Sequence, residues 1–162
     1  MSGADDRLQR AQRLFAEAYQ LQMAGHLDAA IARYLESIQC HPTAEAHTFL
    51  GWTYSFQHRL DDAIAECKKA IAIDADFGNP YNDIGSYLLK QGKLDEAIPW
   101  LERAIAAPRY EPRHFPHCNL GRIYWAKGWL RRAIEEFERA LALDPRSRFA
   151  QGALATVRQQ LQ

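Results

Sequence analysis

Three side chains that can ligate a metal ion lie close together in the C-terminal third of the chain. His114, His117 and Cys118 have helix-like spacing, and imidazole and thiolate groups are the usual protein ligands of zinc. The other adjacent Cys–His pair, at 40–41, lies far upstream. The simpler interpretation is a proline-stiffened connector over 109–118 that shifts the helices after it. We therefore predict no metal site, and a metal-binding protein that uses these three residues is an alternative.

No established catalytic motif is present. The sequence has no phosphate-binding loop, no Gly-x-Ser-x-Gly elbow, no His-Glu-x-x-His pair and no dinucleotide-binding fingerprint. Its carboxylates are spread along the chain, and pairs such as Asp61–Asp62 and Asp95–Glu96 stand where helices begin, a position that the helix dipole favours for acids. We predict no enzymatic activity and no cofactor, and an enzyme built on His114, His117 and Cys118 is the least favoured alternative.

The composition is that of an ordinary folded protein with balanced charge. The 162 residues include 20 basic and 20 acidic side chains, and the pI is about 7.0. Nucleic-acid-binding domains usually have a pI above about 9, so nucleic acid is not a predicted partner. No apolar run of about 18 residues occurs, so no membrane insertion is expected. Three irregularly spaced cysteines, with no secretory signal at the start, predict reduced thiols in the cytoplasm.

A seven-residue pattern recurs four times along the chain. The copies are Gly25–Ile31, His58–Ile64, Gly92–Ile98 and Gly128–Ile134, and their central alanines are 33, 34 and 36 residues apart. Each copy is followed by an apolar helix and preceded by a helix with a small residue, which is Ala18, Gly51, Gly85 or Gly121. One helical hairpin cannot bury its apolar face alone, so hairpins repeated at this period stack into a solenoid.

These repeats resemble the tetratricopeptide repeat family. The fourth copy matches the family motif most fully, as His117-x2-Leu120-Gly121-x2-Tyr124, then Ala133-x3-Phe137 and Pro145. The resemblance implies an all-α, right-handed α-solenoid of four helix-turn-helix hairpins, over residues 11–43, 44–77, 78–111 and 114–146. A last helix over 147–161, apolar on one side, is expected to cap the array, so that residues 1–162 form a single domain.

The residues that the motif does not need share the opposite face of each hairpin's first helix. At 100° per residue these side chains cluster, and in a stacked array they are expected to line a concave groove. Aromatic side chains and Arg dominate the binding energy of protein interfaces, although each aromatic here could instead pack against a neighbouring repeat. The predicted peptide-binding residues are Phe15, Tyr19, Thr48, Trp52, Phe56, Asn79, Asn82, Ser86, Phe115, Arg122 and Trp125.

The sequence therefore predicts a protein–protein interaction scaffold or adaptor that binds a peptide or helix of a partner protein, as an assembly factor or in a chaperone-like role. Asn79 and Asn82 are expected to hydrogen-bond the backbone of that peptide. Relatives that bind the acidic tail of heat-shock chaperones use a clamp of Lys, Asn and Arg on this face, and a full clamp is absent here.

Two further hypotheses concern other surfaces. A homo-oligomerising structural module is the main alternative, and Trp100 and Trp129 are predicted to lie outside the groove, where they either cover a neighbouring helix or form a second contact surface. Charge is also uneven, with a net −3 over residues 44–78 and a net +5 over residues 109–162. Solvated helix faces explain this difference simply, and an acidic ligand near the C-terminal half is the sharper interpretation.

Overall fold

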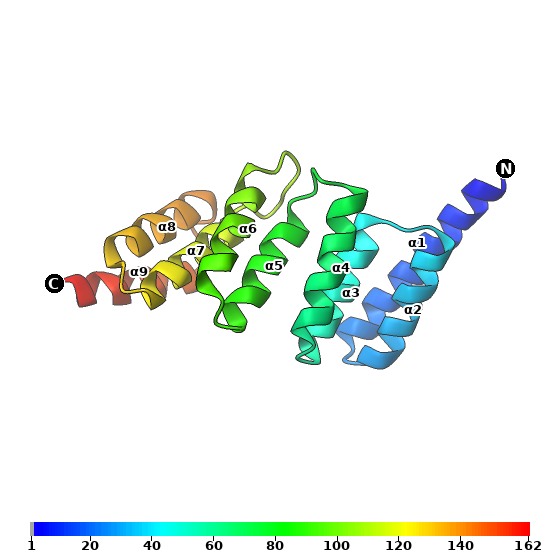
Figure 1. Cartoon of the computed structure of the whole chain (residues 1–162), viewed down its shortest axis with the longest axis horizontal. Helices are drawn as coiled ribbons and strands as arrows, with labels where there is room; N and C mark the ends of the chain where they lie inside the picture. The colour runs from blue at the N-terminus through cyan, green and yellow to red at the C-terminus, as the bar shows by residue number, and fades with distance from the viewer. Residues whose placement is uncertain (1) are drawn as a thin grey trace.

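The computed structural model describes residues 2–162, and within them the chain folds into nine α-helices (Figure 1). Successive helices form antiparallel hairpins that stack side by side into an elongated array, with the two termini at opposite ends. This is an all-α helical repeat fold, as predicted. The helices are α1 (Gly3–Met23), α2 (Leu27–Cys40), α3 (Ala44–Phe56), α4 (Leu60–Ile73), α5 (Asn79–Lys90), α6 (Leu94–Ala106), α7 (His114–Ala126), α8 (Leu130–Leu143) and α9 (Arg148–Leu161).

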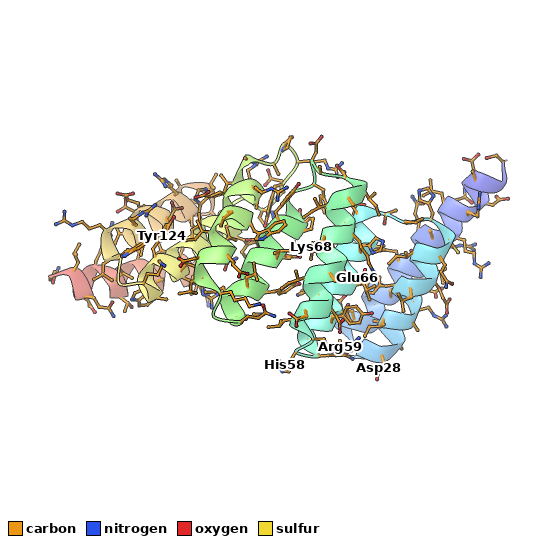
Figure 2. The ribbon with its side chains drawn as sticks, in the orientation of Figure 1. Asp28, His58, Arg59, Glu66, Lys68 and Tyr124 are labelled. Atoms are coloured by element: carbon orange, nitrogen blue, oxygen red, sulfur yellow. The ribbon has the colours of Figure 1, made fainter. Side chains whose placement is uncertain are left out.

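The four hairpin turns share one backbone geometry. In each turn a residue with positive φ follows the first helix: Gly25, His58, Gly92 or Gly128. The next residue donates its backbone N–H to a carbonyl five positions earlier, as Arg59 does to Tyr54 at 3.0 Å. This bond is the 6→1 bond of a Schellman cap, for which glycine is the favoured residue. His58, at φ 60°, is the exception to glycine, and Figure 2 shows it at the tip of the α3–α4 turn.

Small residues let the two helices of a hairpin approach closely. A Cβ atom added at Gly121 would lie 2.5 Å from the Phe137 ring, and one added at Gly85 would lie 2.4 Å from Leu101. Phe137 and Leu101 are themselves fully buried in the core between hairpins. The small residues of the motif therefore fix the distance between the first and second helices.

Two hairpins also contain an equivalent polar pair, buried in one hairpin and partly buried in the other. Nδ1 of His47 lies 2.6 Å from Oε2 of Glu66, and Nδ1 of His117 lies 2.7 Å from Oε2 of Glu136. Burial alone would raise the pKa of Glu66, but hydrogen bonds from His47 and Lys69 outweigh it and lower that pKa. Glu66 is labelled on α4 in Figure 2. These pairs tie the first helix of a hairpin to the second, away from the inner face.

The first helices of neighbouring hairpins contact one another directly, α1 with α3, α3 with α5, and α5 with α7. These four helices therefore form one side of the stack, which we call the inner face. At its end, α9 packs on α8 and buries Ala150, Ala153, Leu154 and Val157, while Ser147 caps its first turn. The first helix begins at Gly3, before the predicted start of the first repeat at residue 11. None of the helices described for residues 2–162 has the length and apolarity needed to cross a membrane.

Candidate functional site

An aromatic band covers the inner face of the first two hairpins. Phe49 on α3 is at its centre, with its ring centroid 5.2 Å from that of Phe15, 5.9 Å from that of Tyr19 and 5.8 Å from that of Trp52. The Trp52 ring in turn lies 5.2 Å from that of Phe56, whose side chain is 46% exposed. Four of these residues were predicted for the groove. Phe49 was missed, and it is the residue that joins them into one surface.

A pocket of about 240 Å³ lies where this band meets the third hairpin. Its walls come from α3, α5, α7 and two connectors, so segments far apart in the sequence build it together. The lining residues are Thr48, Phe49, Trp52, Phe77, Asn79, Asn82, Asp83, Tyr110, Pro112 and Phe115. We call this space the central pocket.

The connector after α6 is held in place by backbone pairing with the connector after α4. The N–H of Gly78 donates to the carbonyl of Arg109 at 2.9 Å, and the N–H of Arg109 donates to the carbonyl of Asp76 at 3.1 Å. Tyr110 packs on Gly78 so closely that a Cβ there would lie 2.3 Å from the Tyr110 ring. This connector, interpreted from sequence only as a stiff link, in fact supplies Tyr110 and Pro112 to the central pocket.

Among the described residues that line the central pocket, Asp83 is the one with a carboxylate. It is partly buried, and burial raises its pKa to about 7, against the smaller opposing effects of a hydrogen bond with Asn82 and the charge of Lys90. Asn82 is itself fixed, because the amide of Asn119 on α7 donates to its Oδ1 at 3.0 Å. A chain of polar contacts thus runs from Asn119 through Asn82 to Asp83 and sets the position of the carboxylate.

A second and larger pocket, of about 580 Å³, lies further along the inner face between α5, α7 and α9. Its lining is cationic and aromatic: Ser86, Leu89, Lys90, Arg122, Trp125, Ala126 and Phe149. The guanidinium of Arg122 lies 5.1 Å from the centre of the Phe149 ring. We call this space the basic pocket. The positive charge of its Lys90 and Arg122 has the same sign as the net charge of residues 109–162.

The predicted groove residues are brought together on this inner face, but three of their polar groups already have partners. The hydroxyl of Thr48 donates to the carbonyl of Ala44 at 2.7 Å, and Oδ1 of Asn82 accepts from Asn119. The indole N–H of Trp125 donates to Gln160 of the cap at 2.8 Å. Asn82 is moreover only 7% exposed. Asn82 therefore helps to position Asp83, and its expected contact with a peptide backbone stays a prediction.

The three candidate metal ligands point to separate partners. His117 is paired with Glu136, and Nε2 of His114 lies 3.5 Å from Oδ2 of Asp144. Cys118 is buried, and burial raises the pKa of its thiol, which disfavours the thiolate that a metal requires. Within residues 2–162 no group of three His, Cys, Asp or Glu side chains could hold a metal ion. The metal alternative therefore has no geometric support.

The two remaining tryptophans lie away from the inner face. Trp100 on α6 is partly buried, and its ring centroid lies 6.2 Å from that of Tyr81. Trp129, in the turn before α8, stacks on Tyr124 at 5.9 Å and is 44% exposed. Figure 2 labels Tyr124 at this end of the array. Trp100 therefore packs against a neighbouring residue, as one of the two predicted alternatives had it. Trp129 also packs on a neighbour, but its ring stays partly exposed to solvent.

Stacked helical hairpins with an inner face built by their first helices define a helical-repeat scaffold. Two family models, both described as tetratricopeptide repeat, match the chain over residues 44–77 and 76–146. With the four hairpins, they show that the chain belongs to the tetratricopeptide repeat family. Proteins of this family are generally non-enzymatic scaffolds for protein–protein interaction.

Individual proteins resemble the chain at low sequence identity. Small glutamine-rich tetratricopeptide repeat-containing protein 2 of Mycosarcoma maydis is 30% identical over 104 residues, a match that covers 63% of this chain and 29% of that protein. The chain thus spans less than a third of that relative's length.

Two solved structures illustrate the likeness in fold. The structure from the functional characterization of Pseudomonas aeruginosa pilF has a TM-score of 0.88 at 22% identity, covering 98% of this chain and 71% of that one. The first tetratricopeptide repeat domain of Spaghetti (RPAP3), bound to the HSP90 peptide SRMEEVD, has a TM-score of 0.67 at 24% identity. The match covers 73% of this chain and 92% of that domain. Both comparisons support the fold alone.

Proposed function

We propose that the chain is a scaffold or adaptor that binds a short segment of a partner protein along the inner face of its first helices. The observation that carries this proposal is that the aromatic band, the central pocket and the basic pocket all lie on the inner face of the first helices. The repeat motif does not need these side chains, and large exposed aromatics together with Arg are typical of binding hot spots.

Two further observations support a peptide as the ligand. The Spaghetti (RPAP3) domain, which has the same fold, was solved with a bound peptide. The surface here also has chemically different regions, which suits a segment with apolar residues toward α1 and α3 and an acidic residue at Lys90 and Arg122. We further propose an assembly or chaperone-like role without enzymatic activity. The three free cysteines fit a reducing compartment such as the cytoplasm.

The test uses the four tryptophans of the chain as reporters. Peptides selected from a random library for binding to the chain are titrated into ¹⁵N-labelled protein, and the four indole N–H signals are followed. The proposal predicts that the signals of Trp52 and Trp125 shift while those of Trp100 and Trp129 stay in place. Shifts confined to Trp129 would contradict it, and a concentration-dependent mass without any peptide binding would favour the homo-oligomer alternative.

A further inference from the structure

The central pocket holds a carboxylate that neither the repeat motif nor the fold requires. Within residues 2–162, no Lys, Arg or His nitrogen forms an ion pair with Asp83. Lys90 lies seven residues further along α5, which is about 10 Å along the helix axis. A carboxylate partly removed from water without an ion-pair partner reduces stability, so its presence on an inner face needs a reason other than folding.

Arg109, a cation beside the pocket wall, is paired with other carboxylates. Arg109 lies over the Phe77 ring at 5.3 Å, but its Nη2 is 2.5 Å from Oδ2 of Asp74 and 3.7 Å from Oε1 of Glu45. It therefore reinforces the wall and forms no ion pair with Asp83.

The surroundings of Asp83 fit a cation with an apolar stem. Rings of Trp52, Phe77 and Tyr110 line the same space, and aromatic faces attract ammonium and guanidinium groups. Lys and Arg side chains bury their methylene groups on apolar surface while the charged head meets a counter-ion. The volume of about 240 Å³ is below the ~300–1,000 Å³ of typical small-molecule sites, so it suits one side chain.

We propose that the central pocket binds one basic side chain, Lys or Arg, of the partner segment, with Asp83 as its counter-ion and the rings of Trp52, Phe77 and Tyr110 around its stem. This inference rests on the proposed function, because it assumes that a segment lies along the inner face. It adds the chemistry by which that segment is recognised and its register: a basic residue at the central pocket and an acidic residue at the basic pocket.

The first test is a double-mutant cycle with a library-selected peptide. Each Lys or Arg of the peptide is replaced in turn by norleucine, and its affinity is measured for the parent chain, for Asp83→Asn and for the matched control Glu102→Gln, an exposed acid on α6. One replacement should lower affinity about tenfold for the parent and the control, and much less for Asp83→Asn. Circular dichroism establishes that the variants are folded.

The second test needs no peptide. N-acetyl-lysine methylamide and its neutral norleucine counterpart are titrated into ¹⁵N-labelled chain at millimolar concentration. The lysine probe should shift the Trp52 indole signal and the amide of Asp83, the norleucine probe should not, and Asp83→Asn should abolish the difference.

The two tests separate the failure of this inference from that of the proposed function. If peptides shift the indole signal of Trp52 but the affinity of none depends on a basic residue, the proposed peptide groove stands and the role of Asp83 is overturned. If no peptide binds the inner face, the proposed function fails, and a lysine probe that behaves like norleucine overturns the inference as well.

Discussion

Asp83→Asn should stabilise the protein at neutral and higher pH, although it removes a side chain from the binding surface. Burial raises the pKa of Asp83 from its ordinary value of 3.8 to about 7, so the folded state binds this proton more tightly than the unfolded chain does. Stability from this group is therefore present at low pH and declines as the pH rises from about 4 to about 7. Above that range the folded protein carries the full cost of a buried carboxylate.

The size of the effect follows from the shift in pKa. A displacement of about three units corresponds to at most about 4 kcal/mol, at about 1.4 kcal/mol per unit. Asp83 is only partly buried, so solvent screening reduces this value, and about 1–3 kcal/mol is the expected gain in the free energy of unfolding. The groups that act on this carboxylate are Asn82 and Lys90, and both lower its pKa. Cys67, Tyr87 and Tyr110 feel its charge in return.

The assay is urea denaturation at about pH 5 and about pH 8, with Glu102→Gln as the matched control on an exposed face. The free energy of unfolding of Asp83→Asn should exceed that of the parent at the higher pH, and the gap should narrow at the lower pH. A variant no more stable than the parent at about pH 8 would refute the reasoning, because it would mean that Asp83 is well solvated or already paired.

Four further changes test the packing, one turn and the cap of the array. Gly121→Ala should destabilise the protein by about 1–3 kcal/mol, because its Cβ would lie 2.5 Å from the Phe137 ring. Gly152→Ala meets nothing within 4 Å and should stabilise α9 by about 0.5–1 kcal/mol. Equal melting temperatures for the two variants would contradict this. His58→Gly should stabilise by about 0.5–1 kcal/mol by relieving the positive φ, and an unchanged or lower melting temperature would count against it. Deleting residues 147–162 should expose the apolar side of the last hairpin and cause the chain to associate, which sedimentation measures. A truncated chain that stays monomeric with unchanged helicity would contradict this.

The hairpins themselves could be predicted from local spacing. The repeated turn pattern, the small residues and the central alanines report contacts between helices that are neighbours in sequence, and α3 to α8 follow them closely. The inner face was predictable for the same reason, since a helix has a fixed period. Asp83 was within reach of that logic, because it lies four residues after Asn79 and three before Ser86 on the same face.

The central pocket was not predictable in the same way. Phe77 and Tyr110 lie in connectors without a period, and their meeting depends on backbone bonds between residues 76–78 and 109, more than thirty positions apart. The roles of Thr48 and Asn82 also escaped the sequence, because a short polar side chain can bond to its own helix or to a neighbouring one as readily as to a ligand. Periodicity assigns such residues to a face but does not reveal which of their atoms are free.

The affinity of a library-selected peptide for Trp52→Ala, compared with Trp129→Ala, tests the central claim most directly. Trp52 joins the aromatic band to the central pocket, and Trp129 is an exposed ring of the same type away from the inner face. If the inner face binds the partner segment, Trp52→Ala should cost about 2 kcal/mol, a loss of about thirtyfold in affinity, while Trp129→Ala binds like the parent. Parental affinity for Trp52→Ala together with a large loss for Trp129→Ala would contradict the claim and move the binding site to the outer surface.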